Sequence, residues 1–325
     1  MIAKRAAEMT SFIVMDVLEK AHEMERQGTD VIHLEVGEPD FDTPQCIIDA
    51  AEKALKDGYT HYTHSLGIIE LREAICEYYA NTYRVTIDPD QIIVTPGTSP
   101  AMFMLFATIL EENDEVIISD PHYACYPNFI KFFKGVPVTV PVYENDGFQY
   151  RTTSIQEKIC AKTKGIFINS PSNPTGNLLS TDRMQKIAEL SPYIISDEIY
   201  HGLVYGEKAH SIHEFTDRAF IFNGFSKLYA MTGFRLGYAC APAPIIEAMM
   251  KIHQYSMLCA PIMSQVAAIE ALENGAKSVI EMKQAYHQRR DYMVRRLNEM
   301  GIDCHTPGGA FYVFPNIQKF GMTSK

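Results

Sequence analysis

The sequence lacks any apolar run approaching the roughly 18 residues that a membrane-spanning helix needs, so no part of it is expected to cross a membrane. It is also poor in positive charge, with 29 lysine and arginine residues against 40 aspartate and glutamate residues and a net charge of -11. Binding to nucleic acid depends on cationic contacts with phosphates, so this balance argues against a nucleic-acid partner. Residues 1–8 include basic side chains but lack the apolar segment of a signal peptide.

Cysteine pairs at metal-binding spacing are absent as well. The seven cysteines are scattered, and none forms a C-x-x-C pair, which indicates free thiols in a reducing cytoplasm rather than disulfides or a zinc site. The glycine-rich signatures of dinucleotide-binding folds and of P-loop proteins do not occur either. The HSIHE segment at 210–214 differs from the HExxH zinc motif, so we interpret it as a solvated loop and expect no metal site.

What is present is an alternation of short, nearly all-apolar β-rich runs with helical patterns. This alternation predicts an α/β fold, a large domain whose mixed, mostly parallel seven-stranded sheet lies between helices. The expected strands are 92–95, 116–119, 136–140, 165–169, 193–196, 219–223 and 237–240. The expected helices are 43–58, 68–83, 101–110 and 182–190. Thr43 is the expected N-cap of the first helix, with Pro44 in its first turn.

A second, smaller α+β domain is expected at the C-terminus. Residues 263–300 have a long helical pattern interrupted at Asn274-Gly275, and a strand pattern follows at 309–314. A single strand makes a poor domain, and the chain stops at Lys325, so this domain is expected to be incomplete. The predicted division is 1–45 for an N-terminal arm with part of the small domain, 46–275 for the large domain, and 276–325 for the long helix and the start of the small domain.

Four segments of unusual composition follow predicted strands, at the edge where open α/β sheets bind ligands. In TPGTSPA, residues 95–101, free N–H groups and hydroxyls at a helix start could cradle a phosphate, although a plain capping turn is an alternative. In NSPSNPTG, residues 169–176, rigid turns would either aim the Asn173 amide at a ligand or form a simple Asx/proline turn.

The other two segments carry charge. IISDEIY, residues 194–200, brings an apolar run to Asp197, a carboxylate that is costly to bury without a cationic partner; a helix N-cap is the structural alternative. NGFSKLYAMTGFRLG, residues 223–237, contains Lys227 and Arg235, either of which alone would be a surface charge. The order of the four segments along the chain argues for one shared site.

These segments, in this order, resemble the class I aminotransferases, fold-type I enzymes that use pyridoxal 5′-phosphate (PLP). The resemblance extends from about Ile32 to Phe314 and rests on the patterns SPSNPTG, SDEIY and SKxxxMTGxRxG. It is strongest to the aspartate aminotransferase-like branch, whose GEPDFDTP motif is present at 37–44. It implies that 46–275 is a PLP-binding domain and that the protein moves an amino group between an amino acid and a 2-oxo acid.

The resemblance implies a role for each residue that would face the cofactor. Lys227 would form the Schiff base with PLP and would move the substrate α-proton as a general base. Asp197 would pair with the pyridine nitrogen and so keep the ring an electron sink. Asn173 and Tyr200 would hydrogen-bond the phenolic oxygen, and Tyr123 would stack on the ring face.

The resemblance also implies residues for the phosphate, the substrate and a second subunit. An arginine fork matches phosphate oxygens, and the implied phosphate ligands are Thr98, Ser99, Ser226 and Arg235. Tyr62 would reach the phosphate site of a neighbouring subunit, which implies a homodimer. The backbone of Gly37, together with Asn173, would bind the substrate carboxylate. Pro121 and Pro174 match positions where relatives have cis peptide bonds.

The sequence departs from the family pattern in places that bear on activity. Gly224 is found where some relatives carry a phosphate-binding serine. Relatives also continue well past the GGAFY segment at 308–312, through a stretch that carries the arginine for the substrate α-carboxylate. Its absence here indicates either a fragment of a longer protein or a short protein with altered activity. We expect residues 1–325 to contain the cofactor site without the complete substrate site.

The leading interpretation is a cytoplasmic aminotransferase of amino acid metabolism that acts in a biosynthetic process by ping-pong chemistry. The alternatives are a PLP-dependent lyase on the same fold and a PLP-binding protein without turnover. No lysine or arginine occurs between Arg84 and Lys131, and Met102, Phe103 and Met104 lie beside the expected phosphate loop. This pattern favours neutral or apolar amino donors over dicarboxylates.

Overall fold

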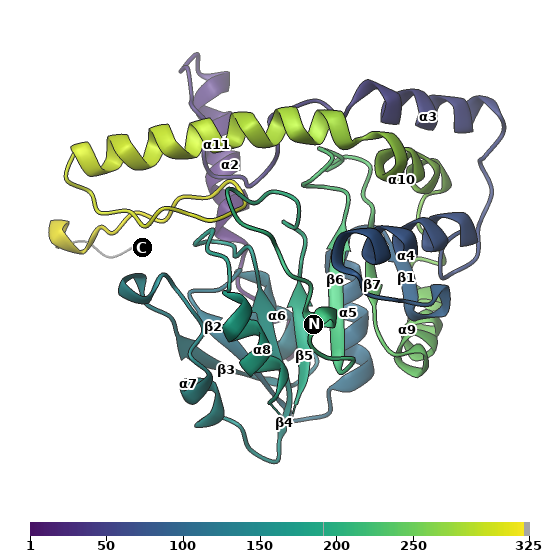
Figure 1. Cartoon of the computed structure of the whole chain (residues 1–325), viewed down its shortest axis with the longest axis horizontal. Helices are drawn as coiled ribbons and strands as arrows, with labels where there is room; N and C mark the ends of the chain where they lie inside the picture. The colour runs from purple at the N-terminus through teal and green to yellow at the C-terminus, as the bar shows by residue number, and fades with distance from the viewer. Residues whose placement is uncertain (191, 322–325) are drawn as a thin grey trace.

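The fold is built around one seven-stranded sheet, seen in a computed structural model that describes residues 1–190 and 192–321 (Figure 1). The strands are β1 (Ile92–Thr95), β2 (Glu115–Asp120), β3 (Val136–Pro141), β4 (Thr163–Asn169), β5 (Tyr193–Asp197), β6 (Ala219–Gly224) and β7 (Gly237–Cys240). Their order across the sheet is β1-β7-β6-β5-β4-β2-β3. Each expected strand is present, which confirms the α/β prediction.

The sheet is mostly parallel. β7 pairs antiparallel with both β1 and β6, whereas the β2–β3, β2–β4, β4–β5 and β5–β6 pairs are all parallel. Every residue of β1, β6 and β7 is buried, so elements cover both faces of the sheet there. Because β4, β5 and β6 run the same way, their carboxyl ends meet at one edge of the sheet.

Helices cover both faces of the sheet, and the strands contribute alternate residues to two cores. Ile166 and Ile168 of β4 belong to one core, whereas Phe167 between them belongs to the other. The longer helices are α2 (Ile13–Arg26), α3 (Gln45–Lys56), α4 (Ile69–Tyr83), α5 (Thr98–Ile109), α6 (Cys125–Phe132), α8 (Thr181–Ala188), α9 (Ala243–Ser256), α10 (Ile262–Asn274) and α11 (Ala276–Glu299). Shorter ones are α1 (Lys4–Ala7), α7 (Thr152–Gln156), η1 (Pro89–Gln91), η2 (Glu144–Asp146), η3 (Ile212–Glu214) and η4 (Gln318–Phe320).

The expected break in the long C-terminal helical stretch is confirmed. Gly275 separates α10 from α11, and a Cβ at this position would lie 2.5 Å from the Ala271 carbonyl oxygen and 2.9 Å from the Tyr229 ring. Only glycine fits so close to both neighbours. The helix α11 then runs across the end of the sheet as the long yellow-green helix in Figure 1.

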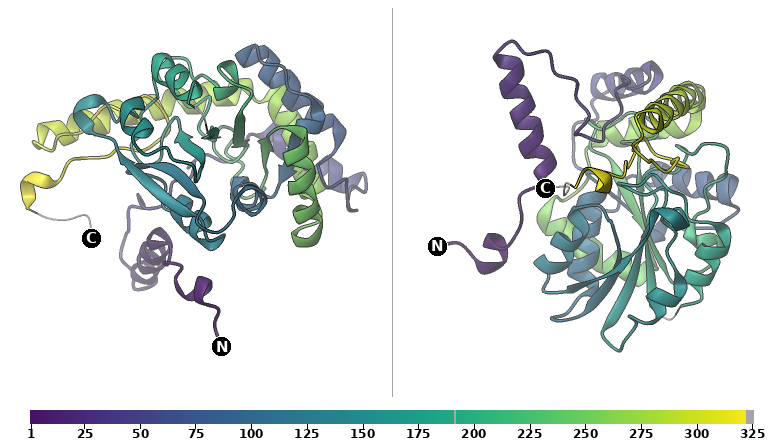
Figure 2. Two further views of the ribbon diagram at one scale, coloured as in Figure 1. Left: turned by 90° about the horizontal axis from the view of Figure 1, so that it is seen from below. Right: turned by 90° about the vertical axis from the view of Figure 1, so that its left-hand side faces the viewer.

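The N-terminal segment has no counterpart among the helices expected from the sequence. Helix α2 stands apart from the sheet and its covering helices, as the right-hand view of Figure 2 shows. Ala21 is its one buried residue, and Ile13, Met15 and Val17 are exposed. Within residues 1–190 and 192–321, no helix has both the length and the apolarity needed to cross a membrane.

Two local predictions were wrong. Pro44, not Thr43, occupies the N-cap of α3, because the Thr43 hydroxyl donates instead to the Ala230 carbonyl oxygen at 2.6 Å. Residues 309–314 form no strand, although isolated bridges join Val204 to Gly309 and Cys304 to Pro315. The positive φ of Ala310, 56°, ends the extended run before a ladder can form.

Candidate active site

Most of the predicted site residues meet in one cavity at the carboxyl edge of the sheet. The cavity has a volume of about 410 Å³, within the range of small-molecule sites. The predicted residues that line it are Gly37, Thr98, Ser99, Tyr123, Asn173, Asp197, Tyr200 and Lys227. They come from segments far apart in the sequence, so the tertiary structure brings the four motifs together as expected.

Asp197 is the last residue of β5 and is buried at the base of the cavity. The Tyr126 hydroxyl donates to its Oδ2 at 2.7 Å, and the Ile199 N–H donates to its Oδ1 at 3.2 Å. Burial raises the pKa of Asp197 to about 6, while these two hydrogen bonds and the charge of Lys227 act in the opposite direction. A cation placed against this carboxylate would therefore offset the cost of its burial.

Lys227 follows β6 in a buried turn and points its ammonium group into the same cavity. Its Nζ donates to the Gly37 carbonyl oxygen at 2.6 Å. Burial lowers the pKa of Lys227 to about 8, against the opposing effect of Glu38 and with a smaller lowering by Arg235. A lysine of this pKa is partly neutral near pH 7 and can act as a nucleophile or a base.

Asn173 and Tyr200 lie on another wall of the cavity, joined by a residue that sequence reasoning did not select. The Tyr312 hydroxyl is 2.5 Å from the Tyr200 hydroxyl and accepts a hydrogen bond from Asn173 Nδ2 at 3.2 Å. The Asn173 N–H donates to Asn169 Oδ1 at 2.7 Å, which holds the segment against the end of β4. The expected cis bonds before Pro121 and Pro174 are confirmed, and Ser170-Pro171 is cis as well.

Thr98 and Ser99 begin helix α5, where free backbone N–H groups favour an anion. Gly97 precedes them with a φ of 95°, and a Cβ there would lie 2.7 Å from Arg235 Nη2. The guanidinium therefore lies directly against the turn that leads into the helix. A helix N-terminus with two hydroxyls and an adjacent arginine is suited to a phosphate group.

Three of the predicted residues do not line the cavity. Ser226 is buried beside Lys227, and Arg235 is exposed, with its Nη1 donating to the Thr232 carbonyl oxygen at 2.9 Å. Tyr62 is 83% exposed. Gly224 cannot be replaced by serine on this backbone, because a Cβ there would lie 2.8 Å from the Gly237 Cα.

Sequence reasoning missed Tyr126, Asn169 and Tyr312. Tyr126 lies three residues after Tyr123 in the same segment, and both line the cavity. Asn169 is the first residue of its motif, and Tyr312 is the last of GGAFY, so each was inside a segment already singled out. The N-terminal residues Phe12, Val14 and Met15, which also line the cavity, had no signal in the sequence.

The residues present fit PLP. The buried Asp197 carboxylate has no cation in hydrogen-bond contact within the described chain, and a protonated pyridine nitrogen would supply one. The amine of Lys227 matches the aldehyde, and the start of α5 with Arg235 matches the phosphate. Among the same described residues, no group of three or more His, Cys, Asp or Glu side chains is arranged to hold a metal ion.

Comparison with known proteins gives the same result. The sequence profile of the family "Aminotransferase class I and II" matches residues 29–322. The chain is 44% identical over 325 residues to (5-formylfuran-3-yl)methyl phosphate transaminase of Methanocaldococcus jannaschii, covering 99% of this chain and 86% of that protein. It is 41% identical to aspartate aminotransferase of Pyrococcus horikoshii, covering 100% and 84%. Thermus thermophilus aspartate aminotransferase with maleate has a TM-score of 0.96 at 36% identity, covering 98% and 86%.

The family match extends over nearly the whole chain, and the solved structure shares the arrangement of the sheet and its helices. The relatives at this level of identity are named as transaminases or aminotransferases. The chain therefore belongs to the class I and II aminotransferases, PLP-dependent enzymes that move an amino group between an amino acid and a 2-oxo acid.

Proposed function

We propose that Lys227, Asp197, Asn173 and Tyr200 are the working residues of an aminotransferase site for neutral or apolar amino donors. The observation that carries this proposal is the pairing of Lys227, which is half-buried, with the buried Asp197, both facing one cavity. A lysine whose pKa is lowered, close to a carboxylate whose pKa is raised, is typical of a catalytic site. PLP, when bound, supplies an electron-withdrawing ring that stabilises the electron pair left by removal of the substrate α-proton.

Lys227 would hold the cofactor and then carry the α-proton on its Nζ. Its pKa near 8 means that the neutral amine needed for either task is available close to physiological pH. The Gly37 carbonyl oxygen accepts from this amine at 2.6 Å and so orients it toward the cavity. Gly37 would also present its backbone to the substrate carboxylate, beside the Asn173 amide.

Asp197 would pair with the ring nitrogen and keep it protonated. Tyr126 and the Ile199 N–H stabilise its ionised form, so it remains available as an anion in a buried position. Tyr200 and Asn173 would hydrogen-bond the phenolic oxygen on the other side of the ring, and Tyr123 would cover the ring face. Together these contacts would fix the ring relative to Lys227.

The phosphate would bind at the start of α5, to Thr98 and Ser99, with Arg235 and Ser226 beside it. Tyr62 would complete the phosphate site of a second subunit, a role that its 83% exposure supports. The apolar side chains left exposed on the N-terminal segment further support a homodimer. We assign the protein to the cytoplasm and to amino acid biosynthesis, with seven free thiols in support of a reducing compartment.

The substrate preference rests on the walls of the cavity. Phe12, Val14, Met15 and Met102 give it an apolar side, and Glu35 contributes negative charge. Lys227 is the one lysine or arginine among the described residues that line it, so a distal carboxylate of the substrate would find no second cation there. The named relatives act on aspartate or on a furan aldehyde phosphate, so their names support amino transfer without specifying this donor.

The test is a screen of amino donors with 2-oxoglutarate or pyruvate as acceptor, with the 2-oxo acid product measured directly. We expect product from neutral or apolar donors at a higher kcat/KM than from aspartate, and no product from Lys227→Ala. Ammonia release without an acceptor would indicate a lyase, and PLP binding without product would indicate a protein without turnover. Equal kcat/KM for aspartate and for an apolar donor would contradict the proposed preference.

A further inference from the structure

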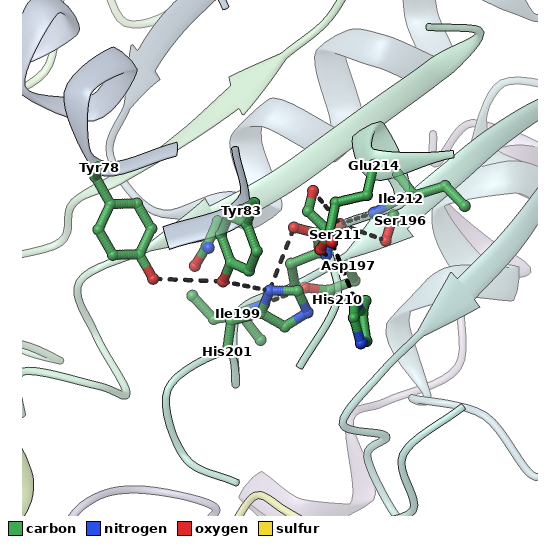
Figure 3. A network of polar contacts seen from close by, with 12 residues as sticks. Tyr78, Tyr83, Ser196, Asp197, Ile199, His201, His210, Ser211, Ile212 and Glu214 are labelled. Carbon is green, nitrogen blue, oxygen red and sulfur yellow. Dashed lines mark hydrogen bonds and ion pairs between the residues drawn. The ribbon is translucent and has the colours of Figure 1, made fainter. Parts of the chain in front are cut away.

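A buried polar network that includes Tyr83, Ser196 and His201 is shown in Figure 3. It adjoins the turn that carries Tyr200 into the cavity. The turn comprises Glu198–His201 and is closed by a hydrogen bond from the His201 N–H to the Glu198 carbonyl oxygen at 2.9 Å. It directly follows Asp197, whose Oδ1 accepts the Ile199 N–H of the same turn. Glu198 and His201 do not line the cavity, although Asp197 and Tyr200 do.

The side chain of Glu198 anchors the first end of the turn. Its Oε1 accepts from the Ser196 hydroxyl at 3.0 Å, the Ser211 hydroxyl at 3.1 Å and the Ile212 N–H at 3.0 Å. All of these groups are buried. Glu198 is therefore tied both to its own strand β5 and to η3, and its backbone N–H is bound to the Phe222 carbonyl oxygen of β6 at 2.8 Å.

His201 anchors the second end. The Tyr83 hydroxyl, at the end of α4, is 2.8 Å from His201 Nδ1, and the imidazole is also hydrogen-bonded to the Ser170 backbone. Burial lowers the pKa of His201 to about 3, so the ring is neutral. The turn is thus held by Tyr83 of α4, by Ser170 and by η3, none of which lines the cavity.

Glu198 is neutral in this environment. Burial raises its pKa to about 8, and Glu214 acts in the same direction. Its Oε2 receives no hydrogen bond from the described residues and lies 3.4 Å from His201 Nδ1. A proton on Oε2 would remove the charge of Glu198, which leaves no unpaired charge beside Asp197.

We propose that Glu198 and His201 are positioning residues of the aminotransferase site: they hold both ends of the turn from behind and so set Asp197 and Tyr200 at a fixed separation against the cofactor ring. The proposal rests on the roles given above to Asp197 and Tyr200. It extends the site to a layer that touches neither substrate nor cofactor. Small displacements of this kind matter because a shift of about 1 Å in a reacting group can cost about 100-fold in rate.

The test compares Glu198→Ala, Glu198→Gln and Ile155→Ala in the PLP-bound enzyme. The Ala variant leaves Ser196, Ser211 and the Ile212 N–H without their acceptor, whereas Gln keeps that acceptor and remains uncharged. Ile155, fully buried on α7 and away from the cavity, is the control for general destabilisation. The readouts are the dissociation constant for PLP by equilibrium dialysis, the pH midpoint of the visible absorption of the bound cofactor, and kcat with KM.

For Glu198→Ala we expect about tenfold weaker PLP binding, a visible midpoint moved by about half a pH unit or more, and kcat lowered more than KM is raised. In Glu198→Gln, the PLP affinity, the visible midpoint and the kinetic constants should all stay near their wild-type values. Ile155→Ala should lower the unfolding temperature while leaving the dialysis and absorption values unchanged. Tyr83→Phe, which removes one hydrogen bond to His201 and is milder for folding, should move the midpoint in the same direction by less.

Wild-type affinity and midpoint in Glu198→Ala, or in Tyr83→Phe if the Ala variant does not fold, would overturn the proposal. So would a Gln variant as impaired as the Ala variant, because the carboxylate charge and not the geometry would then be responsible. A failure of the proposed function would be visible in the wild type instead, as absent amino transfer. The dialysis and absorption comparisons would still report on Glu198 in that case.

Discussion

The Tyr126 hydroxyl donates a 2.7 Å hydrogen bond to Oδ2 of Asp197, and both groups are buried. Tyr126 lies on α6 and Asp197 ends β5, so the contact joins a helix on one face of the sheet to the strand end that forms the floor of the cavity. The bond favours the ionised carboxylate and partly offsets the rise in its pKa caused by burial. The ionised Asp197 that would face the protonated ring nitrogen is thus stabilised by Tyr126, a residue that lies outside the four motifs.

Removal of the Tyr126 hydroxyl should destabilise the ionised form of Asp197. In Tyr126→Phe the pKa of Asp197 rises above its value of about 6, so its charged form is lost at a higher pH as the solution is acidified. As the pH is lowered, the loss of PLP affinity should therefore begin at a higher pH in Tyr126→Phe than in the wild type. Near neutral pH, kcat of the variant should be lower by about three- to tenfold. PLP dissociation constants measured between about pH 5 and 8 test this.

Tyr150→Phe is the matched control for Tyr126→Phe. The Tyr150 hydroxyl is also buried but has no hydrogen-bond partner among the described residues, and it lies outside the cavity. Its removal should leave the pH dependence of PLP binding unchanged. Identical profiles for the two variants would show that Tyr126 does not tune Asp197.

The capture of PLP should follow the ionisation of Lys227. The neutral amine is the nucleophile, so in the cofactor-free protein the rate should rise as the pH increases through about 8 and then level off. Stopped-flow absorbance gives this rate, and borohydride reduction followed by peptide mapping identifies the modified lysine. Lys227→Ala should bind PLP without a reducible bond. A label on another lysine would refute the assignment.

Gly97 should be required for the phosphate site. In Gly97→Ala a methyl group would meet Arg235 Nη2 at 2.7 Å and would also strain a backbone with φ of 95°. We expect PLP binding about tenfold weaker or more, since a charge-assisted contact contributes about 1.5–3 kcal/mol. The measurement is a PLP titration followed by absorbance.

Gly28→Ala is the control that distinguishes backbone strain from the steric contact with Arg235. Gly28 has a similar φ of 89°, but a Cβ there would have no neighbour within 4 Å. It should lower stability slightly without changing PLP affinity. If both alanine variants bind PLP as tightly as the wild type, Arg235 does not contribute to the phosphate site.

Glu198 should make the folded protein less stable as the pH rises from about 6.5 to 8. Its pKa is raised from 4.5 to about 8, so the folded state holds the proton more tightly, and the stabilisation present below 4.5 is lost as the pH passes through 8. His201 acts in the opposite sense only below 6.5, and Lys227 only above about 8. Asp197, whose pKa is also raised, lowers stability with rising pH in the same sense as Glu198, but only below about pH 6.

Glu198→Gln should therefore flatten the stability curve in this window. Urea midpoints of the cofactor-free wild type and variant, measured at about pH 6.5 and 8, give the comparison. The wild-type midpoint should fall over this range and the variant midpoint should fall less. An equal slope for both proteins would mean that Glu198 is already ionised in the folded state.

The sequence by itself determined the strand positions and the segments that carry the site. The apolar runs of the strands are local features, and strands buried on both faces, such as β1, β6 and β7, require them. The turns after β4, β5 and β6 contain Asn173, Asp197 and Lys227, and a parallel sheet brings the carboxyl ends of such strands to one edge. These conclusions needed only composition, order and the resemblance to a family.

Only the tertiary structure decided which groups hold those residues in place. Tyr126 and Asp197 are 71 positions apart, and Tyr312 and Asn173 are 139 positions apart, so no local pattern predicts that their side chains meet. The same holds for Tyr83 and His201, 118 positions apart. Burial is likewise a property of the folded chain, and it is burial that brings the pKa values of Lys227 and Asp197 toward neutrality.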